Sequence, residues 1–366
     1  MIPMGCSHKE LWPDPVAAGP GQYRPEGAVV TSPVTSSVAK FPETECLASS
    51  SGRNSKRRRG KMPTITTHYG IPDPVPFVDV EAMADNRLYV DPHAIRLRKT
   101  PQPFADQALE CIDTFFHEVT NSVIEGTPST RRRGENLLQH FVEPWETRLG
   151  MAAAGFHGHG GAEVVGTWIW EVLNDDVEAL VRVGVLRQLE DLPLFVDGVD
   201  RDITSDITTR IIFEPLTQFT EAMIDMYPQF TSAGHEVKTY RKQVWDPVAR
   251  EWAEANVTLP VVGGKPLLLV PKAWSRRTLL MSAGRYYETS VLSFAQLEQA
   301  VRTSDDKVRT TPKKQLKTQP GLGRGRGTNL RVTMRAFEDE QDLLAHFKAF
   351  VTSRFDKKKT DEEPAA

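Results

Sequence analysis

The chain has 366 residues, of which 39% are hydrophobic, and is long enough to bury a substantial core. Its formal net charge of −3 excludes the overall basic field of many non-specific nucleic-acid binders, and no apolar run approaches the roughly 20 residues of a transmembrane helix. The three cysteines, Cys6, Cys46 and Cys111, are too sparse for a disulfide framework or a zinc site, so we expect a cytoplasmic protein with no disulfide partner.

The N-terminal segment, residues 1–61, is rich in Pro, Ser, Gly and Thr and has no periodic apolar pattern. Such a composition predicts a disordered extension. It ends in a basic run over 56–61, which is typical of a nucleic-acid arm or a nuclear signal. Met62 follows at once, and the alternative is that residues 1–61 lie upstream of a true start at Met62.

The main domain is predicted over residues 62–302. It begins with alternating apolar residues, interrupted by Pro and Asp, which predict short extended pieces. Apolar residues at helical spacing then predict three helices, over 105–124, over 129–149 with a break at Pro144, and over 162–183.

A glycine-rich loop, residues 155–161, precedes the third predicted helix. Such a loop can aim backbone N–H groups at a phosphate, and histidine can add a donor or a metal ligand. The loop lacks the Lys-Ser/Thr ending of a Walker motif and follows no clear strand. Two interpretations stay open, a solvent-facing turn and a phosphate-binding loop made of His157, Gly158, His159 and Gly160.

The densest chemistry lies in the central stretch, residues 192–227. Its apolar run 194–196 predicts a short buried strand, and the turn after this run carries several aspartates. A long helix is expected to follow, with Ser205 available to cap its N–H groups and a kink at Pro215, where proline removes a backbone hydrogen bond.

The following region, residues 235–270, has the pattern of β structure. Gly263 and Gly264 are suited to the two-residue loop of a hairpin, and the apolar run 267–270 predicts an interior strand. A further helix is expected over 285–301.

The C-terminal part divides by composition into three pieces. Residues 303–336 are basic and glycine-rich, which is typical of a linker or mobile loop. Residues 337–355 predict a last helix that packs on the main domain, and residues 356–366 a disordered tail. The whole pattern predicts a helix-rich α+β fold, with amphipathic helices packed around a small, mostly antiparallel sheet.

Four carboxylates gather around the turn of the central stretch. A metal-dependent phosphodiesterase needs two or three carboxylates that converge on a divalent cation such as Mg²⁺. The metal ligands that this hypothesis assigns are Asp197, Asp200, Asp202 and Asp206. The structural alternative is that these aspartates shape the turn and favour the helix N-terminus through capping and the helix dipole.

The nuclease hypothesis also assigns catalytic side chains. Glu236-Val237-Lys238 matches the acidic-x-Lys element of the PD-(D/E)xK nucleases, with Asp206 as the upstream acid. A long helix between this acid and the lysine departs from the hairpin arrangement of that family. Lys272, at the end of an apolar run, is the other candidate cation, so the predicted catalytic residues are Asp206, Glu236, Lys238 and Lys272.

The basic segment over 307–335 is the best candidate for phosphate contacts, because Gly-Arg-Gly-Arg-Gly combines a flexible backbone with cations. The nucleic-acid-binding residues predicted there are Lys313, Lys314, Lys317, Arg324 and Arg326. The alternative is a basic linker whose side chains are simply solvated.

The run LPLFVDGVDRDITSDITTRII, followed by GKPLLLVPK and YYETSVLSFAQLE, resembles a group of uncharacterised bacterial proteins associated with mobile elements and phage-defence neighbourhoods. The resemblance covers about residues 75–350. It implies a bacterial, cytoplasmic role related to nucleic acid, and it carries over no catalytic residue.

Two functions follow from these observations. The first is a Mg²⁺-dependent nuclease or phosphodiesterase with a defence-related role, and the implied neighbourhood favours it. The second is a non-catalytic protein that binds DNA, RNA or a protein partner, in which the carboxylates are structural and the basic segment makes the contacts. The oligomeric state is open in both.

Overall fold

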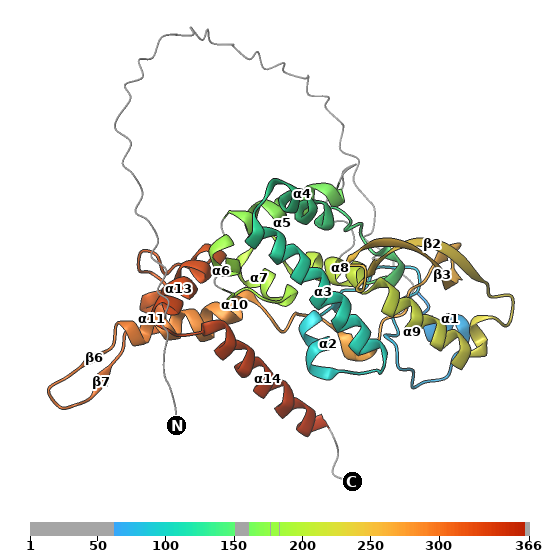
Figure 1. The fold of residues 1–366 in the computed structure, drawn as a ribbon. Helices are drawn as coiled ribbons and strands as arrows, with labels where there is room; N and C mark the ends of the chain where they lie inside the picture. The colour runs from blue at the N-terminus through green and yellow to red at the C-terminus, as the bar shows by residue number, and fades with distance from the viewer. Residues whose placement is uncertain (1–61, 151–160, 176, 183, 363–366) are drawn as a thin grey trace, which may run out of the picture. The chain divides into compact units, whose positions relative to one another are not determined.

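The computed structural model describes residues 62–150, 161–175, 177–182 and 184–362, which are drawn in colour in Figure 1. Helices dominate these ranges, and their strands form three small antiparallel sheets. The prediction of a helix-rich α+β fold is confirmed. The expected N-terminal extension, residues 1–61, lies outside the described residues, as does the end of the expected tail.

The helices fall into two groups along the chain, separated by the main β-hairpin (Figure 1). Those before the hairpin are α1 (Ile65–Tyr69), α2 (Pro92–Arg98), α3 (Phe104–Glu125), α4 (Pro128–Leu138), α5 (Gly161–Asn174), α6 (Glu178–Arg182), α7 (Leu192–Phe195), α8 (Arg201–Ile211) and α9 (Phe213–Met226). Those after it are α10 (Ala283–Tyr286), α11 (Leu292–Glu298), α12 (Lys313–Leu316), α13 (Arg326–Glu338) and α14 (Leu343–Glu362).

The largest sheet is a three-stranded antiparallel ribbon. Its strands are β2 (Val237–Asp246), β3 (Glu251–Val262) and β4 (Lys265–Pro266). The predicted hairpin loop is confirmed, since Gly263 and Gly264 join β3 to β4 with φ of 58° and 77°, a conformation that glycine adopts without strain. The two smaller sheets pair β1 (Tyr89–Val90) with β5 (Ser275–Arg276) and β6 (Val301–Arg302) with β7 (Val308–Arg309).

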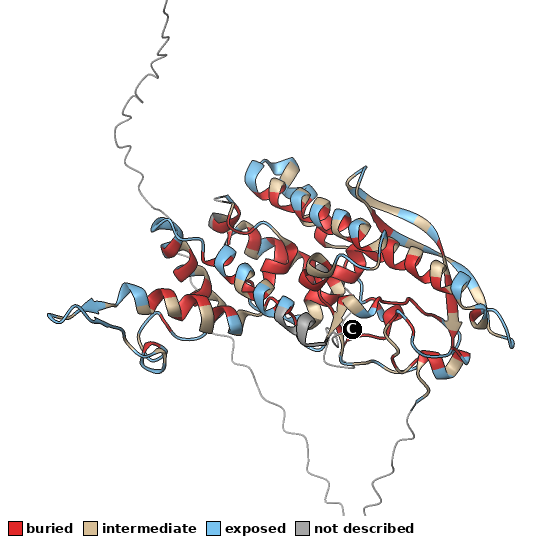
Figure 2. Cartoon of the chain, turned by 90° about the horizontal axis from the view of Figure 1, so that it is seen from below, coloured by how far each residue is buried: buried red, intermediate tan, exposed pale blue. Residues whose placement is uncertain are grey.

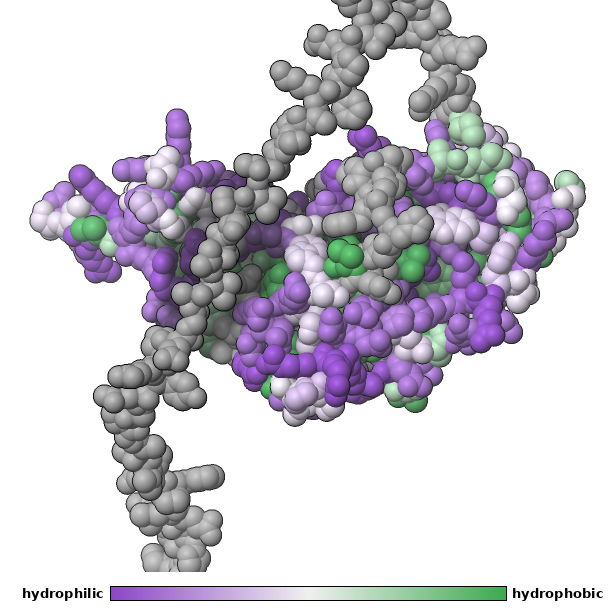
Figure 3. Space-filling model, turned by 90° about the horizontal axis from the view of Figure 1, so that it is seen from above, coloured by the Kyte–Doolittle hydropathy of each residue, from purple (hydrophilic) through white to green (hydrophobic). Residues whose placement is uncertain are grey.

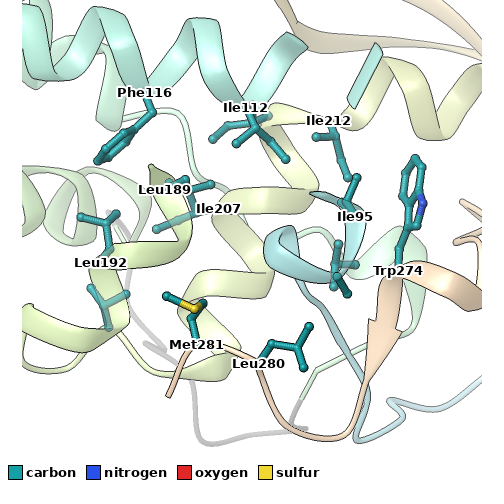
Figure 4. Close-up of a cluster of buried hydrophobic side chains, with 14 of the residues drawn as sticks. Ile95, Ile112, Phe116, Leu189, Leu192, Ile207, Ile212, Trp274, Leu280 and Met281 are labelled. Carbon is teal, nitrogen blue, oxygen red and sulfur yellow. The ribbon is translucent and has the colours of Figure 1, made fainter. Parts of the chain in front are cut away.

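The core is built around α3, which contacts α2, α4, α6, α8, α9 and β2. Ile112, Phe116 and Val119 repeat at helical spacing on α3 and are at most 2% exposed. In Figure 4, Ile112 and Phe116 face the layer that holds Ile207 of α8 and Ile212. Figure 2 shows the same division along the helices, with buried residues on the inner faces and exposed residues outside.

The central stretch differs from its prediction in two places. The apolar run 194–196 is not a strand: Leu192–Phe195 form helix α7, with Pro193 in its first turn. A short buried apolar run has no periodicity that separates strand from helix, so the misassignment has a physical basis. The expected single kinked helix is two helices that meet at Ile212, because Pro215 has no N–H to donate to the carbonyl of Ile211 and its ring clashes there.

Capping of the central helix also differs from the prediction. The side chain of Asp200, not that of Ser205, accepts the N–H groups of Asp202 and Ile203. Ser205 lies one turn inside α8, where its hydroxyl accepts the N–H of Val90 at 2.9 Å. Ser205 therefore joins α8 to strand β1 rather than ending a helix.

Three further predicted elements are shorter or absent. The helix expected over 129–149 ends at Leu138, and the one expected over 162–183 is divided into α5 and α6. The apolar run 267–270 is buried but forms no strand, because its N–H groups donate to unlike partners, including the carbonyl of Glu146 and the hydroxyl of Thr220.

The C-terminal part is more ordered than its composition predicts. The helix expected over 285–301 is a continuous run of α10, a π-helical segment (Tyr287–Val291) and α11. The predicted linker over 303–336 is wrong as secondary structure, since it holds β7, α12 and most of α13. Glycine and arginine at the start of α13 hid the helix, whose buried face is made of small and polar residues such as Thr328, Asn329 and Thr333. The last predicted helix is present as α14.

Gly166 of α5 lies directly against the end of α4. A Cβ added at this position would be 2.2 Å from the carbonyl oxygen of Leu138, which is backbone and cannot swing away. We expect Gly166→Ala to lower the free energy of unfolding by about 1–3 kcal/mol, although alanine favours helix, because the two helices must separate. Urea denaturation measures the difference.

Gly327→Ala in α13 is the matched control. Its Cβ would meet only a flexible arginine end at 3.4 Å, so the variant should be as stable as the parent chain or slightly more so. A Gly166→Ala protein as stable as Gly327→Ala would contradict the close packing of α4 and α5.

Candidate functional site

Two adjoining cavities open between the first helix group and the C-terminal helices. The larger, about 570 Å³, is lined by the turn between α7 and α8, by residues 278–285, and by the start of α13. The smaller, about 490 Å³, is lined by residues 86–89 and shares Arg201 and Thr278 with the first. The surface around them is mostly hydrophilic in the view of Figure 3.

Arginine is the main charged residue of both cavities. We call this feature the arginine groove, defined by Arg87, Arg201, Arg277, Arg285, Arg324 and Arg326. The only carboxylates among its lining residues are Asp197 and Asp200, so six positive charges face two negative ones. The groove is therefore a local cationic surface on a chain whose net charge is −3.

Helix α8 and helix α13 each place an arginine at their first residue. Asp200 caps α8 and so fixes Arg201, whose guanidinium lies over the ring of Tyr89 at 4.9 Å. Arg326 begins α13 and donates to the carbonyls of Pro193 and Val199, both at 2.9 Å. These contacts fix the position of both guanidinium groups against the turn between α7 and α8.

Three other arginines have unused hydrogen-bonding capacity. Arg87, Arg277 and Arg324 are exposed, and the structure describes no hydrogen bond or ion pair between them and another described residue. A guanidinium group carries five N–H donors in a planar fork that matches two oxygens of a phosphate or carboxylate. These three side chains can thus bind an anion without breaking an existing described contact.

The start of α13 adds a second attraction for anions. Its cap residue is Gly325, which has no side chain to accept the first N–H groups of the helix. Those N–H groups and the positive end of the helix dipole favour a negative group. Asn329, 1% exposed in the wall of the larger cavity, donates to the carbonyl of Leu194, and its own carbonyl oxygen has no described partner.

The predicted metal ligands do not form one cluster. Asp197 is exposed at the rim of the larger cavity, 3.6 Å from Arg326, whereas Asp200 is used as a helix cap. Burial raises the pKa of Asp206 to about 8, with further increases from Asp202 and Glu143 and an opposing effect of Arg210. Within the described ranges, no three His, Cys, Asp or Glu side chains are placed to hold a metal ion. Mg²⁺ binding stays a prediction.

The predicted catalytic residues are also separate. Glu236 and Lys238 form an exposed ion pair at 2.6 Å near the start of β2, and Lys272 is exposed in a 3₁₀ turn. No described hydrogen bond or ion pair joins Asp206 to Lys238 or to Lys272. Nuclease activity therefore also stays a prediction.

The predicted nucleic-acid-binding residues divide into two sets. Arg324 and Arg326 lie in the arginine groove. Lys313 instead donates to the carbonyl of Glu288 at 2.5 Å, and Lys317 donates to the Glu288 carboxylate at 2.6 Å, so both fasten α12 to the π-helical segment. Lys314 is exposed on α12 and is not among the residues that line the groove.

Sequence reasoning missed four members of the groove: Arg87, Arg201, Arg277 and Arg285. They are isolated or paired arginines in three separate segments, and no spacing rule connects them. The predicted phosphate-binding loop, with His157, Gly158, His159 and Gly160, lies outside the described residues.

Two other predictions concern cysteine and the membrane. Cys111 is a buried free thiol on α3, and burial raises its pKa to about 12. Cys6 and Cys46 lie in the segment that the structure does not describe. In the described part of the chain, every helix is too short or too polar to cross a membrane.

Comparison with known proteins gives one match. A family model described as a domain of unknown function (DUF8370) matches residues 71–282. No curated protein and no solved structure matches the chain. The match covers Arg87, Arg201 and Arg277 of the groove, while Arg285, Arg324 and Arg326 follow it in the sequence.

Proposed function

Because the chain belongs to the DUF8370 family, for which no function is known, we propose its function from geometry: it binds nucleic acid through the phosphates, in the arginine groove. The observation that supports this proposal is the set of six arginines that line two adjoining cavities with only two carboxylates among them.

The chemistry of the groove suits phosphate. Arginine binds phosphate oxygens through two parallel N–H donors, and such charge-assisted hydrogen bonds are roughly twice as strong as neutral ones. The uncapped start of α13 offers backbone N–H groups to the same kind of ligand. Both features recognise the phosphate group rather than a base, so the proposed binding has little dependence on sequence.

The shape of the groove favours a chain of phosphates over one small phosphate ester. Its arginines are distributed over two cavities of about 570 and 490 Å³ that share Arg201 and Thr278, rather than gathered around one point. A single phosphate could engage only some of them, whereas a nucleic-acid backbone presents one charge after another along the groove.

Removal of two groove charges tests the proposal. We expect the double variant Arg277→Gln/Arg324→Gln to bind a fluorescein-labelled single-stranded DNA about tenfold or more weakly at low salt. The slope of log K against log salt should become shallower by about 1.4, because each lost phosphate contact releases fewer counterions. Fluorescence anisotropy titrations at several salt concentrations measure both quantities.

Arg132→Gln is the matched control, since Arg132 is an exposed arginine of α4 with no described hydrogen bond or ion pair. Its affinity and salt slope should equal those of the parent chain. The proposal fails if the parent chain does not bind nucleic acid, or if the double variant binds it with the parent's affinity and slope.

A further inference from the structure

A third cavity lies next to the arginine groove. It has a volume of about 350 Å³ and is lined by residues 82–85, by Trp145 and Arg148, and by the β3–β4 turn with Lys265. Residues 86–89, which continue the same loop, line the smaller cavity of the groove. The two cavities are therefore on either side of one short segment of chain.

That dividing segment is held firmly. The side chain of Asn86 donates to the carbonyls of Glu81, Ala84 and Arg148, at 3.2, 2.7 and 3.1 Å. The backbone of Asn86 also pairs with Leu149 in an isolated parallel bridge. The groove and the third cavity are thus fixed relative to each other without needing a change in the fold.

The third cavity presents an aromatic ring among cations. Trp145 is 37% exposed, a large fraction for tryptophan in a described region that buries Trp245 and Trp274 completely. Three cationic groups lie near its ring centroid: Arg148 at 5.6 Å, Lys242 at 5.6 Å and Lys265 at 5.7 Å.

The three cations differ in what else they bind. The guanidinium of Arg148 donates to three backbone carbonyls, and Lys242 forms an ion pair at 2.5 Å with the buried Glu146. Both are needed by the fold. Lys265 is exposed, and no hydrogen bond or ion pair to another described residue is present, so its ammonium group can move to a ligand.

The ring itself is mounted on a rigid support. Glu146, the next residue, is fully buried, with Lys242 on one carboxylate oxygen and Arg210 3.5 Å from the other. The backbone of Glu146 accepts the N–H of Leu268. An aromatic surface that is held in place loses little conformational entropy when a ligand stacks on it.

We propose that the nucleic acid bound in the arginine groove is single-stranded and that one of its bases stacks on Trp145, with Lys265 on the adjacent phosphate. This inference rests on the proposed function and names its substrate class. A base inside a duplex has both faces covered by its neighbours, whereas an unpaired base has a face free for an aromatic side chain.

Binding of three DNA probes of equal length tests the inference: a single strand, a duplex, and a single strand that carries abasic sites. The parent chain should bind the plain single strand about tenfold more tightly than the abasic one. Trp145→Leu should remove that difference and leave duplex binding unchanged. Trp145→Phe should restore most of it, because a ring is present again.

Phe337→Leu is the matched control, since Phe337 is 39% exposed on α13 and lines none of these cavities. Circular dichroism spectra and thermal melts check that each variant is folded. If Trp145→Leu keeps the parent's preference for the plain single strand, the stacking site is overturned.

The two proposals fail in distinguishable ways. Loss of binding in Arg277→Gln/Arg324→Gln together with equal affinity of the parent chain for all three probes would leave the groove supported and overturn only the stacking site. Absence of binding by the parent chain to every probe would overturn both.

Discussion

Lys348→Met should lower the free energy of unfolding by about 3–5 kcal/mol at pH 7, because it leaves a buried carboxylate without its cation. The carboxylate is that of Asp191, which is fully buried before α7. The ammonium group of Lys348, on α14, lies 2.8 and 2.9 Å from its two oxygens and also donates to the side chain of Gln188. Methionine keeps the length of the side chain and removes only the charge and its donors.

The loss should depend on pH. Burial raises the pKa of Asp191 to about 6, while Lys348 opposes this rise and the Glu190 carboxylate adds to it. Without Lys348 the pKa rises further. A carboxyl group whose pKa is higher in the folded state destabilises the fold progressively as pH rises above the unfolded value. The deficit of the variant should thus be small near pH 4 and largest above pH 6, as measured by urea denaturation across this range.

Lys314→Met makes the same substitution at an exposed lysine of α12 and should change the free energy of unfolding by less than about 0.5 kcal/mol. A second variant, Lys348→Met with Asp191→Asn, removes the uncompensated charge and should recover part of the loss. Equal stability of Lys348→Met and Lys314→Met at pH 7 would show that Asp191 does not depend on Lys348.

Asp206→Asn should have the opposite effect and stabilise the protein by about 3 kcal/mol at pH 7. Burial, Asp202 and Glu143 raise the pKa of Asp206 from its ordinary 3.8 to about 8, against the opposing charge of Arg210. The folded state therefore holds a proton that the unfolded chain releases between these two values. Asparagine resembles the protonated acid and carries no such cost.

The sign can be followed across pH. Below pH 4 both states of the parent chain are protonated at this residue, and Asp206→Asn should have little effect. Between pH 4 and 8 the parent chain loses stability, and the advantage of the variant should grow over this window. Asp225→Asn, at an exposed position of α9, should show no such growth. A parent chain and an Asp206→Asn variant with parallel stability curves over pH 4–8 would contradict the raised pKa.

Much of the fold could be predicted from residue patterns. The long amphipathic repeat of α3 and the Gly263-Gly264 turn each depend on local rules, and both were predicted correctly. Errors arose where local signals are ambiguous. The run Leu194–Val196 fits a strand or a helix, and the polar buried face of α13 looks like a linker because its partners are the carbonyls of other segments.

The site was less predictable. Arg324 and Arg326 were identified because their glycine-rich surroundings are conspicuous, but Arg87, Arg201 and Arg277 are brought to them only by tertiary packing. The acidic turn drew attention as a metal site, yet Asp200 is used to cap α8 and Asp197 lies beside Arg326. Composition reveals charge, and it does not reveal which charges the fold brings together.

The end of the family match, residue 282, falls inside a packed core. Phe195 of α7 contacts Tyr286, which contacts Phe347 of α14, at ring separations of 5.7 and 5.1 Å. Arg326 and Asn329 of α13 donate to carbonyls on either side of that helix. A protein that inherits only the matched part must shield α7 with another partner, so recombination at this boundary would exchange one wall of the groove and leave the other in place.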